Sequence, residues 1–469
     1  MSVPSWLKRL LQTLISLVAL AALTLGVLVY AFGMHVEFAG SGMRPMFSFD
    51  NPDEHFADLE ANRSQHYSRH LPPGPLAGDT DEPSRPYWTD FRGPARDGRY
   101  NQTRVTTEWP VEGLTPKWRQ PIGGGYASFV VADKRAFTIE QRRSQEVVAA
   151  YELETGRELW THAWDAYFDE AMGGAGPRAT PTWNRGRLYA LGATGRLWSL
   201  DAKTGDVLWE RNILADSQAT NLDWAMSGAP LVVDNLVVLQ PGGTDGWSVV
   251  AYHRETGDVV WHALDDVQSY TSPMLMTLAG ERQLVVVTAE RVVGLTLEGH
   301  LLWEYPWKIS IVPNIAQPVR VGADRLFLSA SYGRGAAVIE LTSPQPPFTV
   351  ETVWENTRMK NKFGSSVLHD GYLYGLDESI LACIDPRTGE QMWKGGRYGY
   401  GQLLLAGDHL IVLTERGELA LVRATPEGHD EIARSPGIEG KTWNIPALAD
   451  GYLLIRNARE MAAFDLSMR

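Results

Sequence analysis

The sequence is poor in the residues and motifs that usually carry chemistry. It has a single cysteine, Cys383, among 469 residues, so an internal disulfide is excluded and we interpret Cys383 as a buried apolar residue. It has no HExxH pattern, no Cys/His metal spacing, no Walker loop and no GxSxG elbow. Its formal net charge is −13 with no basic stripe, which argues against nucleic acid as a partner.

A repeated strand pattern is what the sequence does have. Residues 186–209 read GRLYALGATGRLWSLDAKTGDVLW, in which apolar and polar residues alternate as in half-buried strands. Reversals fall at residues 192–195 and 202–205, where Gly205 is free to adopt a positive φ. With residues 180–184 in front, the unit is four short antiparallel strands. One such sheet cannot cover both of its faces, so it requires copies of itself.

Copies of the unit recur along the chain at intervals of roughly 40–50 residues, the range of propeller blades. Their signature is Thr-Gly followed by tryptophan, at Thr155-Gly156 with Trp160, Thr204-Gly205 with Trp209, Thr256-Gly257 with Trp261 and Thr388-Gly389 with Trp393. Gly299 and Trp303 keep the spacing without the threonine, residues 343–347 replace the turn before Trp354, and Gly428 is followed by Ile432.

The two ends of the repeat region complete the count. The last unit, residues 443–466, lacks its outermost strand, whereas residues 115–120 (TPKWRQ) form an outermost strand with no blade before it. We therefore predict an all-β fold: an eight-bladed β-propeller in which the N-terminal strand completes the C-terminal blade. Closure of the ring removes the exposed edges that an open repeat would leave.

The repeat resembles a known family. Residues 200–209, LDAKTGDVLW, are similar to the pyrroloquinoline quinone (PQQ) repeat of eight-bladed propellers, and residues 88–98, WTDFRGPARDG, resemble the opening of bacterial PQQ-like propeller proteins. That superfamily includes quinoprotein alcohol dehydrogenases and the propeller subunit of the outer-membrane barrel assembly machine. The resemblance implies that one tryptophan per blade packs between blades: Trp118, Trp160, Trp209, Trp261, Trp303, Trp354 and Trp393. Ile432 departs from this pattern, so we expect a weaker seam at blade seven.

The N-terminal region predicts a membrane anchor. Residues 10–32 carry no charge and, as a helix, would be about 35 Å long, enough to cross a bilayer. Lys8 and Arg9 precede this run and place the N-terminus in the cytoplasm. We predict a cytoplasmic stub and transmembrane signal anchor over residues 1–33, a linker over 34–87 and the propeller over 88–469. The expected location is the inner membrane, single-pass, with the propeller in the periplasm.

Two alternatives stay open for this region. A signal peptide cleaved near Ala31 or Gly33 would release the propeller, although the apolar run is long for one. Within the linker, only residues 52–67 have a weakly helical pattern. Residues 37–49 are less polar than a spacer needs and either dock on the ring or membrane surface or serve as plain linker.

The starts of the innermost strands are the candidate functional positions, because these strands line the central channel of a propeller. Small residues predominate there, so the larger polar and aromatic ones stand out: Tyr126, Arg178, Trp224, Asn314, Gln317, Lys362, Gln402, Trp443 and Asn444. Two cations, several amides and aromatic surfaces would suit a planar anionic ligand. The alternative is that these groups satisfy one another and channel water.

Three functions fit this pattern. The first is a non-catalytic scaffold or recognition propeller that binds an envelope or membrane protein. The second is a PQQ-dependent dehydrogenase, which by the resemblance would need a calcium site, a catalytic aspartate and, in many members, adjacent cysteines that a single cysteine cannot supply. Asn221, Asp223 and Asn314 offer oxygen ligands, but no motif places them together. The third is a sensor or carrier of a small ligand. The cofactor stays unknown, and PQQ with calcium is not favoured.

Overall fold

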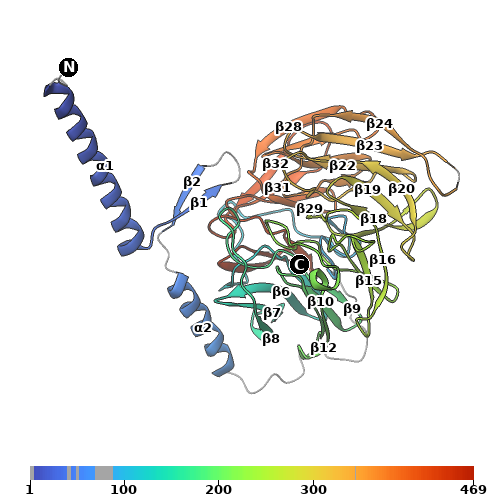
Figure 1. Cartoon of the computed structure of the whole chain (residues 1–469), viewed down its shortest axis with the longest axis horizontal. Helices are drawn as coiled ribbons and strands as arrows, with labels where there is room; N and C mark the ends of the chain where they lie inside the picture. Colours follow the sequence, from blue (N-terminus) through green and yellow to red (C-terminus); the bar gives the residue numbers. More distant parts are fainter. Residues whose placement is uncertain (1–4, 40–43, 49–51, 69–87, 344, 469) are drawn as a thin grey trace.

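The propeller is present. The computed structural model describes residues 5–39, 44–48, 52–68, 88–343 and 345–468. Within these residues eight sheets of four or five strands follow one another around a ring, as Figure 1 shows. Successive strands of a blade pair antiparallel, because each reversal is a short turn, and the first strand of each blade is the innermost one. The predicted fold class is therefore confirmed.

The first four blades contain the following strands: β5 (Val130–Ala132), β6 (Arg135–Arg142), β7 (Gln145–Glu152) and β8 (Glu158–Asp165) in blade one; β9 (Thr182–Asn184), β10 (Arg187–Leu191), β11 (Arg196–Asp201) and β12 (Val207–Asn212) in blade two; β13 (Leu231–Val233), β14 (Leu236–Leu239), β15 (Val249–His253) and β16 (Val259–Ala263) in blade three; β17 (Met274–Leu278), β18 (Glu281–Val287), β19 (Arg291–Leu295) and β20 (Leu301–Pro306) in blade four. A short helix, α3 (Ile213–Asp216), follows blade two.

The remaining blades contain these strands: β21 (Val319–Arg320), β22 (Arg325–Ala330), β23 (Gly335–Leu341) and β24 (Val350–Asn356) in blade five; β25 (Val367–His369), β26 (Tyr372–Asp377), β27 (Ile380–Ile384) and β28 (Gln391–Arg397) in blade six; β29 (Gln402–Ala406), β30 (His409–Leu413), β31 (Leu419–Arg423) and β32 (Glu431–Ser435) in blade seven; β33 (Ala447–Ala449), β34 (Tyr452–Arg456) and β35 (Glu460–Asp465) in blade eight. Blade seven gains a fifth strand, β3 (Arg99–Tyr100), which pairs parallel with β29.

Ring closure follows the predicted route. β4 (Trp118–Pro121) pairs antiparallel with β35, with Trp118 opposite Ala463, and so supplies the outermost strand of blade eight. The N-terminal side of the chain thereby holds the last blade in the ring.

Tryptophans form the seams between most neighbouring blades. Trp160 of blade one lies against the turn of blade two: its indole nitrogen donates to the Ala202 carbonyl, and a Cβ on Gly205 would lie 2.5 Å from its ring. The indoles of Trp118, Trp209, Trp261, Trp354 and Trp393 likewise donate to carbonyls of the following blade. Trp303 is buried between blades four and five but donates to Gln283 of its own blade, because blade five has a different turn.

The prediction that Ile432 occupies the tryptophan position of blade seven is wrong. A bulge in β32 skips Ile432, so Ala433 pairs with Leu421 at the position that Trp209 holds in blade two, and Ile432 is exposed. The turn of blade seven carries one more residue after Gly428 than the other turns, which shifts the register by one. Trp109 belongs to the same core cluster as Ala433, so residues before β4 cover this seam.

Residues 88–98 cross the central channel below its mouth. The Arg96 guanidinium is buried and donates to the carbonyls of Pro273 and Ala229 at 2.9 and 3.3 Å, next to the innermost strands of blades four and three. Arg92 is also buried and donates to the Ser366 carbonyl beside blade six at 2.9 Å. These two arginines satisfy backbone carbonyls from several blades, so residues 88–98 form a plug in the channel.

The N-terminal apolar run forms a single helix, α1 (Ser5–Phe32), which stands clear of the ring in Figure 1. Its segment Arg9–Ala31 is long and apolar enough to cross a membrane. A hairpin of β1 (His35–Ala39) and β2 (Arg44–Ser48) follows. The next element is helix α2 (Pro52–Ser68), at the residues where the sequence has a weakly helical pattern. Residues 69–87 of the predicted linker lie outside the described residues, and the domain boundaries stay predictions.

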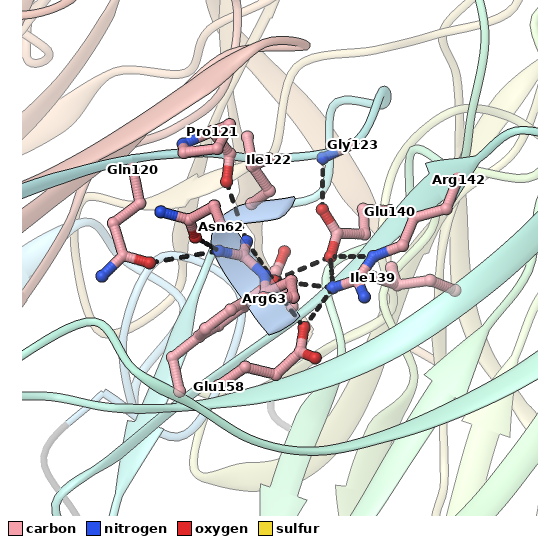
Figure 2. Close-up of polar contacts among 12 residues, drawn as sticks. Asn62, Arg63, Gln120, Pro121, Ile122, Gly123, Ile139, Glu140, Arg142 and Glu158 are labelled. Carbon is pink, nitrogen blue, oxygen red and sulfur yellow. Dashed lines mark hydrogen bonds and ion pairs between the residues drawn. The ribbon is translucent and has the colours of Figure 1, made fainter. Parts of the chain in front are cut away.

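Helix α2 docks on the seam between blades eight and one (Figure 2). Arg63 is 4% exposed and donates to Glu158 at 3.2 Å, to Gln120 at 3.1 Å and to the Pro121 carbonyl at 2.8 Å. It thereby joins the closure strand β4 to β8 of blade one. Part of the predicted linker is thus an ordered clasp on the ring.

The acceptors of the clasp are held in place by further charges. Glu140 is fully buried, and the charges of Arg142 and Arg63, overcoming the cost of burial, lower its pKa to about 2. Arg142 also pairs with Glu158, and Figure 2 shows Arg63 and Arg142 both reaching Glu158. The buried charges are therefore compensated as a network rather than one by one.

Candidate functional site

A cavity of about 200 Å³ occupies the mouth of the central channel. It opens among the loops that lead into the innermost strands, and Phe91 of the plug contributes to its lining. Its aromatic lining residues are Phe91, Tyr126, Trp224, Tyr270, Tyr332, Phe363 and Trp443. The polar ones are Ser128, Glu170, Arg178, Thr180, Ser227 and Gln402. Aromatic side chains from most of the ring therefore converge on one space.

Arg178 lines the cavity, but its guanidinium binds residues of the loop that precedes it rather than pointing into the cavity. Its guanidinium donates to Glu170 at 3.2 Å, to the Gly174 carbonyl at 2.7 Å and to the Gly176 carbonyl. Its side chain is only 8% exposed, and burial lowers its pKa. Arg178 thus holds the glycine-rich loop at residues 173–176 in place beside the mouth.

Lys362 lies beside the cavity within a cage of rings. Its ammonium nitrogen is 4.2 Å from the ring centre of Tyr400, 5.0 Å from Tyr332 and 5.4 Å from Phe363. Burial lowers the pKa of Lys362, and the nearby charges of Glu378 and Glu415 oppose that effect. The second predicted cation is therefore already surrounded by π faces of the protein itself.

The two asparagines fasten backbone segments. Asn314 is buried, and its amide nitrogen donates to the carbonyls of Thr288 and Trp307 at 2.8 and 2.9 Å. Asn444 is fully buried, and its amide donates to the carbonyls of Ala127 and Gly125 at 3.0 and 3.2 Å. Neither lines the cavity.

The two glutamines also join neighbouring blades. Gln402 lines the cavity, but its amide nitrogen donates to the carbonyls of Trp443 and Phe363 at 3.0 and 3.2 Å. The amide of Gln317, in the orientation that satisfies both its ends, bonds the backbone of Ser272. The predicted amides thus bind backbone groups of the ring. This is the arrangement that the second interpretation of the sequence describes, in which the groups satisfy one another.

The predicted aromatic residues do meet at the cavity. Tyr126 and Trp443 stack with ring centres 5.5 Å apart, and Trp224 meets Tyr270 edge-on at 5.9 Å. The sequence did not single out Tyr270, Phe363 or Tyr332. The first two stand at the starts of innermost strands, so a search for aromatic rather than polar residues there would have found them.

Phe91 and Glu170 were also missed, because they lie outside the repeat. Nothing in the repeat spacing marks residues of the plug or of a long connecting loop. Cys383 lies away from the cavity on β27, where it is fully buried and burial raises its pKa to about 12. The prediction of a buried apolar cysteine is confirmed.

Comparison with known proteins places the chain in a family. A family model described as outer membrane protein assembly factor BamB matches residues 143–395, more than half of the chain. The chain therefore belongs to this family of PQQ-like propellers.

Individual relatives are of two kinds. The BamB of Shewanella oneidensis is 21% identical over 318 residues, which is 62% of this chain and 75% of that protein. The quinohemoprotein alcohol dehydrogenase ADH-IIG of Pseudomonas putida is 35% identical over 175 residues, 35% of this chain, and the match spans only 23% of the dehydrogenase. The solved BamB of Moraxella catarrhalis has the same fold, with a TM-score of 0.55 at 15% identity over 76% of this chain and 98% of its own.

The residues at the mouth do not fit PQQ with calcium. A quinone bearing several carboxylates needs donors directed at it, but Arg178 and Gln402 direct theirs at the protein. Calcium needs six to eight oxygens. Asn221, Asp223 and Asn314 do not line the cavity, and the side-chain oxygen of Asn221 already accepts from the Leu222 N–H at 3.0 Å. Within the described parts of the chain, no three His, Cys, Asp or Glu side chains gather as metal ligands.

Proposed function

We propose that this protein is an inner-membrane-anchored periplasmic propeller that acts as a non-catalytic recognition module or scaffold for an envelope or membrane protein. The observation that carries the proposal is the state of the cavity mouth. Its charged and amide groups hold the ring together, whereas its aromatic faces surround an open space. Such a site recognises by shape and ring contacts rather than by chemistry on a cofactor.

The family supports the same assignment. BamB is named as an assembly factor of outer-membrane proteins, and its match with this chain covers most of its length. Closed rings with a plugged channel offer rigid surfaces for partners. The apolar helix α1 supplies the tether, with Lys8 and Arg9 on the cytoplasmic side.

Fractionation and N-terminal sequencing test the anchor. The full-length chain should sediment with inner membranes, and protease added to spheroplasts should reach the propeller. A soluble periplasmic product that starts near Met34 would show that the N-terminal segment is a cleaved signal and would end the anchored version of the proposal.

A PQQ-dependent alcohol dehydrogenase is the second candidate, favoured by the sequence match to ADH-IIG. A dye-linked assay of the full-length protein with PQQ, calcium and short alcohols distinguishes the two. The non-catalytic proposal expects no turnover above the rate without protein. Turnover that depends on both PQQ and protein would replace it with an oxidoreductase. A small-ligand sensor or carrier would bind without turnover.

A further inference from the structure

One corner of the cavity is formed by Trp224 and Tyr270. Their ring centres are 5.9 Å apart at 66°, and the Trp224 backbone N–H donates to the Tyr270 hydroxyl at 3.3 Å. Both side chains line the cavity. The two rings meet edge-on and line one side of the cavity, and the exposed face of an aromatic ring attracts a cation.

Other ring faces at the mouth are already occupied by cations of the chain. Arg178 lies over Tyr126 at 5.5 Å, Lys441 over Trp443 at 4.9 Å and Lys362 over Tyr400 at 4.2 Å. Among the described residues, none places a cation over Trp224 or Tyr270. This corner is therefore a part of the aromatic mouth that no cation of the described residues covers.

The polar groups of the cavity mostly turn their hydrogens away from it. The hydroxyls of Tyr126, Ser128 and Ser227 donate to the carbonyls of Gly173, Ile445 and Tyr270, at 2.6, 2.5 and 3.0 Å. The Trp443 indole donates to Glu415 at 3.0 Å. What these groups leave for a ligand is oxygen lone pairs and ring faces, which suit a donor and disfavour an anion.

A carboxylate stands beside the same corner. Asp223 precedes Trp224 and is exposed, and it forms no ion pair with the part of the chain that the structure describes. Burial raises the pKa of Tyr270 to about 12; the Trp224 N–H opposes this effect, and the negative charges of Asp223 and Glu170 add to it. Glu170 is paired with Arg178, so Asp223 is the charge still available.

We propose that the cavity binds an organic ammonium group against Trp224 and Tyr270, with Asp223 as its counter-ion. The site is thus opposite in charge preference to the planar anion that the sequence suggested. This inference deepens the proposed function and rests on it: the partner or ligand recognised at the mouth presents an ammonium group.

Choline and 3,3-dimethylbutanol test the inference, because the two have the same shape and differ by nitrogen against carbon at the quaternary centre. Each is titrated by calorimetry into full-length protein in maltoside micelles, at up to about 50 mM for a millimolar site. Choline should bind saturably and about tenfold more tightly than the alcohol. Equal affinities, or no choline binding, would overturn the proposal.

Variants locate the site. Trp224→Leu should weaken choline binding about tenfold and Asp223→Asn about threefold. Glu298→Gln, an exposed carboxylate in the turn before β20, is the matched control and should bind as the parent does. If Trp224→Leu binds choline as the parent does and has an unchanged melting temperature, the proposed ammonium site is wrong.

Choline binding and PQQ-dependent turnover, measured on the same protein, distinguish a failure of this inference from a failure of the proposed function. Choline binding together with PQQ-dependent turnover would remove the non-catalytic function and leave the ammonium site standing. Loss of choline binding without turnover would remove the ammonium site and leave the recognition module.

Discussion

At the scale of the residue, the seam tryptophans depend on the absence of a side chain opposite them. Gly205 has φ +80° and would place a Cβ 2.5 Å from Trp160, whereas Gly186 has φ +76° and no atom within 4 Å of its Cβ. An alanine at either position would adopt the same unfavourable positive φ. Only the alanine at position 205 would also clash with Trp160.

Gly205→Ala should therefore destabilise the ring by about 2–4 kcal/mol, and Gly186→Ala by about 1 kcal/mol. Urea unfolding of the two variants measures the difference, which isolates the contact with Trp160. Equal losses would mean that the tryptophan moves aside and that the seam is not tightly packed.

We expect the buried carboxyl of Glu146 to make the stability of the ring depend on pH. It is fully buried and accepts from the Ala193 N–H at 2.9 Å, while its other oxygen finds no well-aligned donor among the described residues. Burial raises its pKa to about 7. The carboxyl is thus favoured in its neutral form by the fold, so the stability it supports is full below its unfolded pKa and is lost as pH rises through about 7.

The melting temperature should fall between pH 5 and pH 8, with a loss of about 2–3 kcal/mol from this group. Glu146→Gln should flatten that fall, whereas Glu112→Gln, at an exposed position, should not. A parental melting temperature that is constant or rises over this range contradicts the assignment.

At the scale of the element, helix α2 follows the apolar helix α1 in the chain and docks on the ring. Its buried Arg63 bridges β4 and β8, whereas its exposed Glu60 pairs with Arg143 at 2.6 Å on the surface. The two contacts belong to one helix and differ mainly in burial.

Arg63→Ala should cost about 2–4 kcal/mol, because it leaves buried acceptors without a donor, and it should expose α2 to protease. Arg143→Ala removes a surface pair and should cost less than about 1 kcal/mol. Limited proteolysis and thermal unfolding check both variants. If the two behave alike, α2 is a loose tether and not a clasp.

Sequence reasoning reached elements that repeat and missed those that do not. Strand alternation and the Gly–Trp spacing of Gly205 and Trp209 predicted the blades, because every blade solves the same packing problem. The α2 clasp rests on buried Arg63, and the plug at residues 88–98 rests on buried Arg92 and Arg96; their partners lie far away in the chain. No local pattern encodes such pairings.

The candidate site shows the same division. Register placed Tyr126, Arg178, Trp224, Gln402 and Trp443 at the cavity, because the starts of innermost strands must meet at the channel. It could not tell whether Arg178 faces a ligand or its own loop, since Glu170 arrives from a connection of irregular length. The one-residue error at Ile432 has a similar origin in the length of a turn.

At the scale of the whole molecule, the ring is one closed structure. β4 completes blade eight, and α2 and the plug attach beside it, so the N-terminal side of the chain holds the seam shut. Deleting residues 115–120 should lower stability cooperatively across all blades, because it opens blade eight. Calorimetry should show one shifted transition, and an unchanged transition would contradict closure by β4.

The membrane and the cavity mouth together define the proposed role. In the proposed location, the ring presents its aromatic mouth to partners in the periplasm. The hydrogen-bond donors that a quinone cofactor would need, those of Arg178 and Gln402, are bonded to backbone carbonyls of the ring.

A calorimetric titration of the full-length protein with PQQ and calcium tests that claim most directly. We predict no saturable binding at concentrations well above micromolar. Saturable binding that is lost in Arg178→Ala or Lys362→Ala and accompanied by dye-linked turnover would contradict the account and make this protein a quinoprotein enzyme.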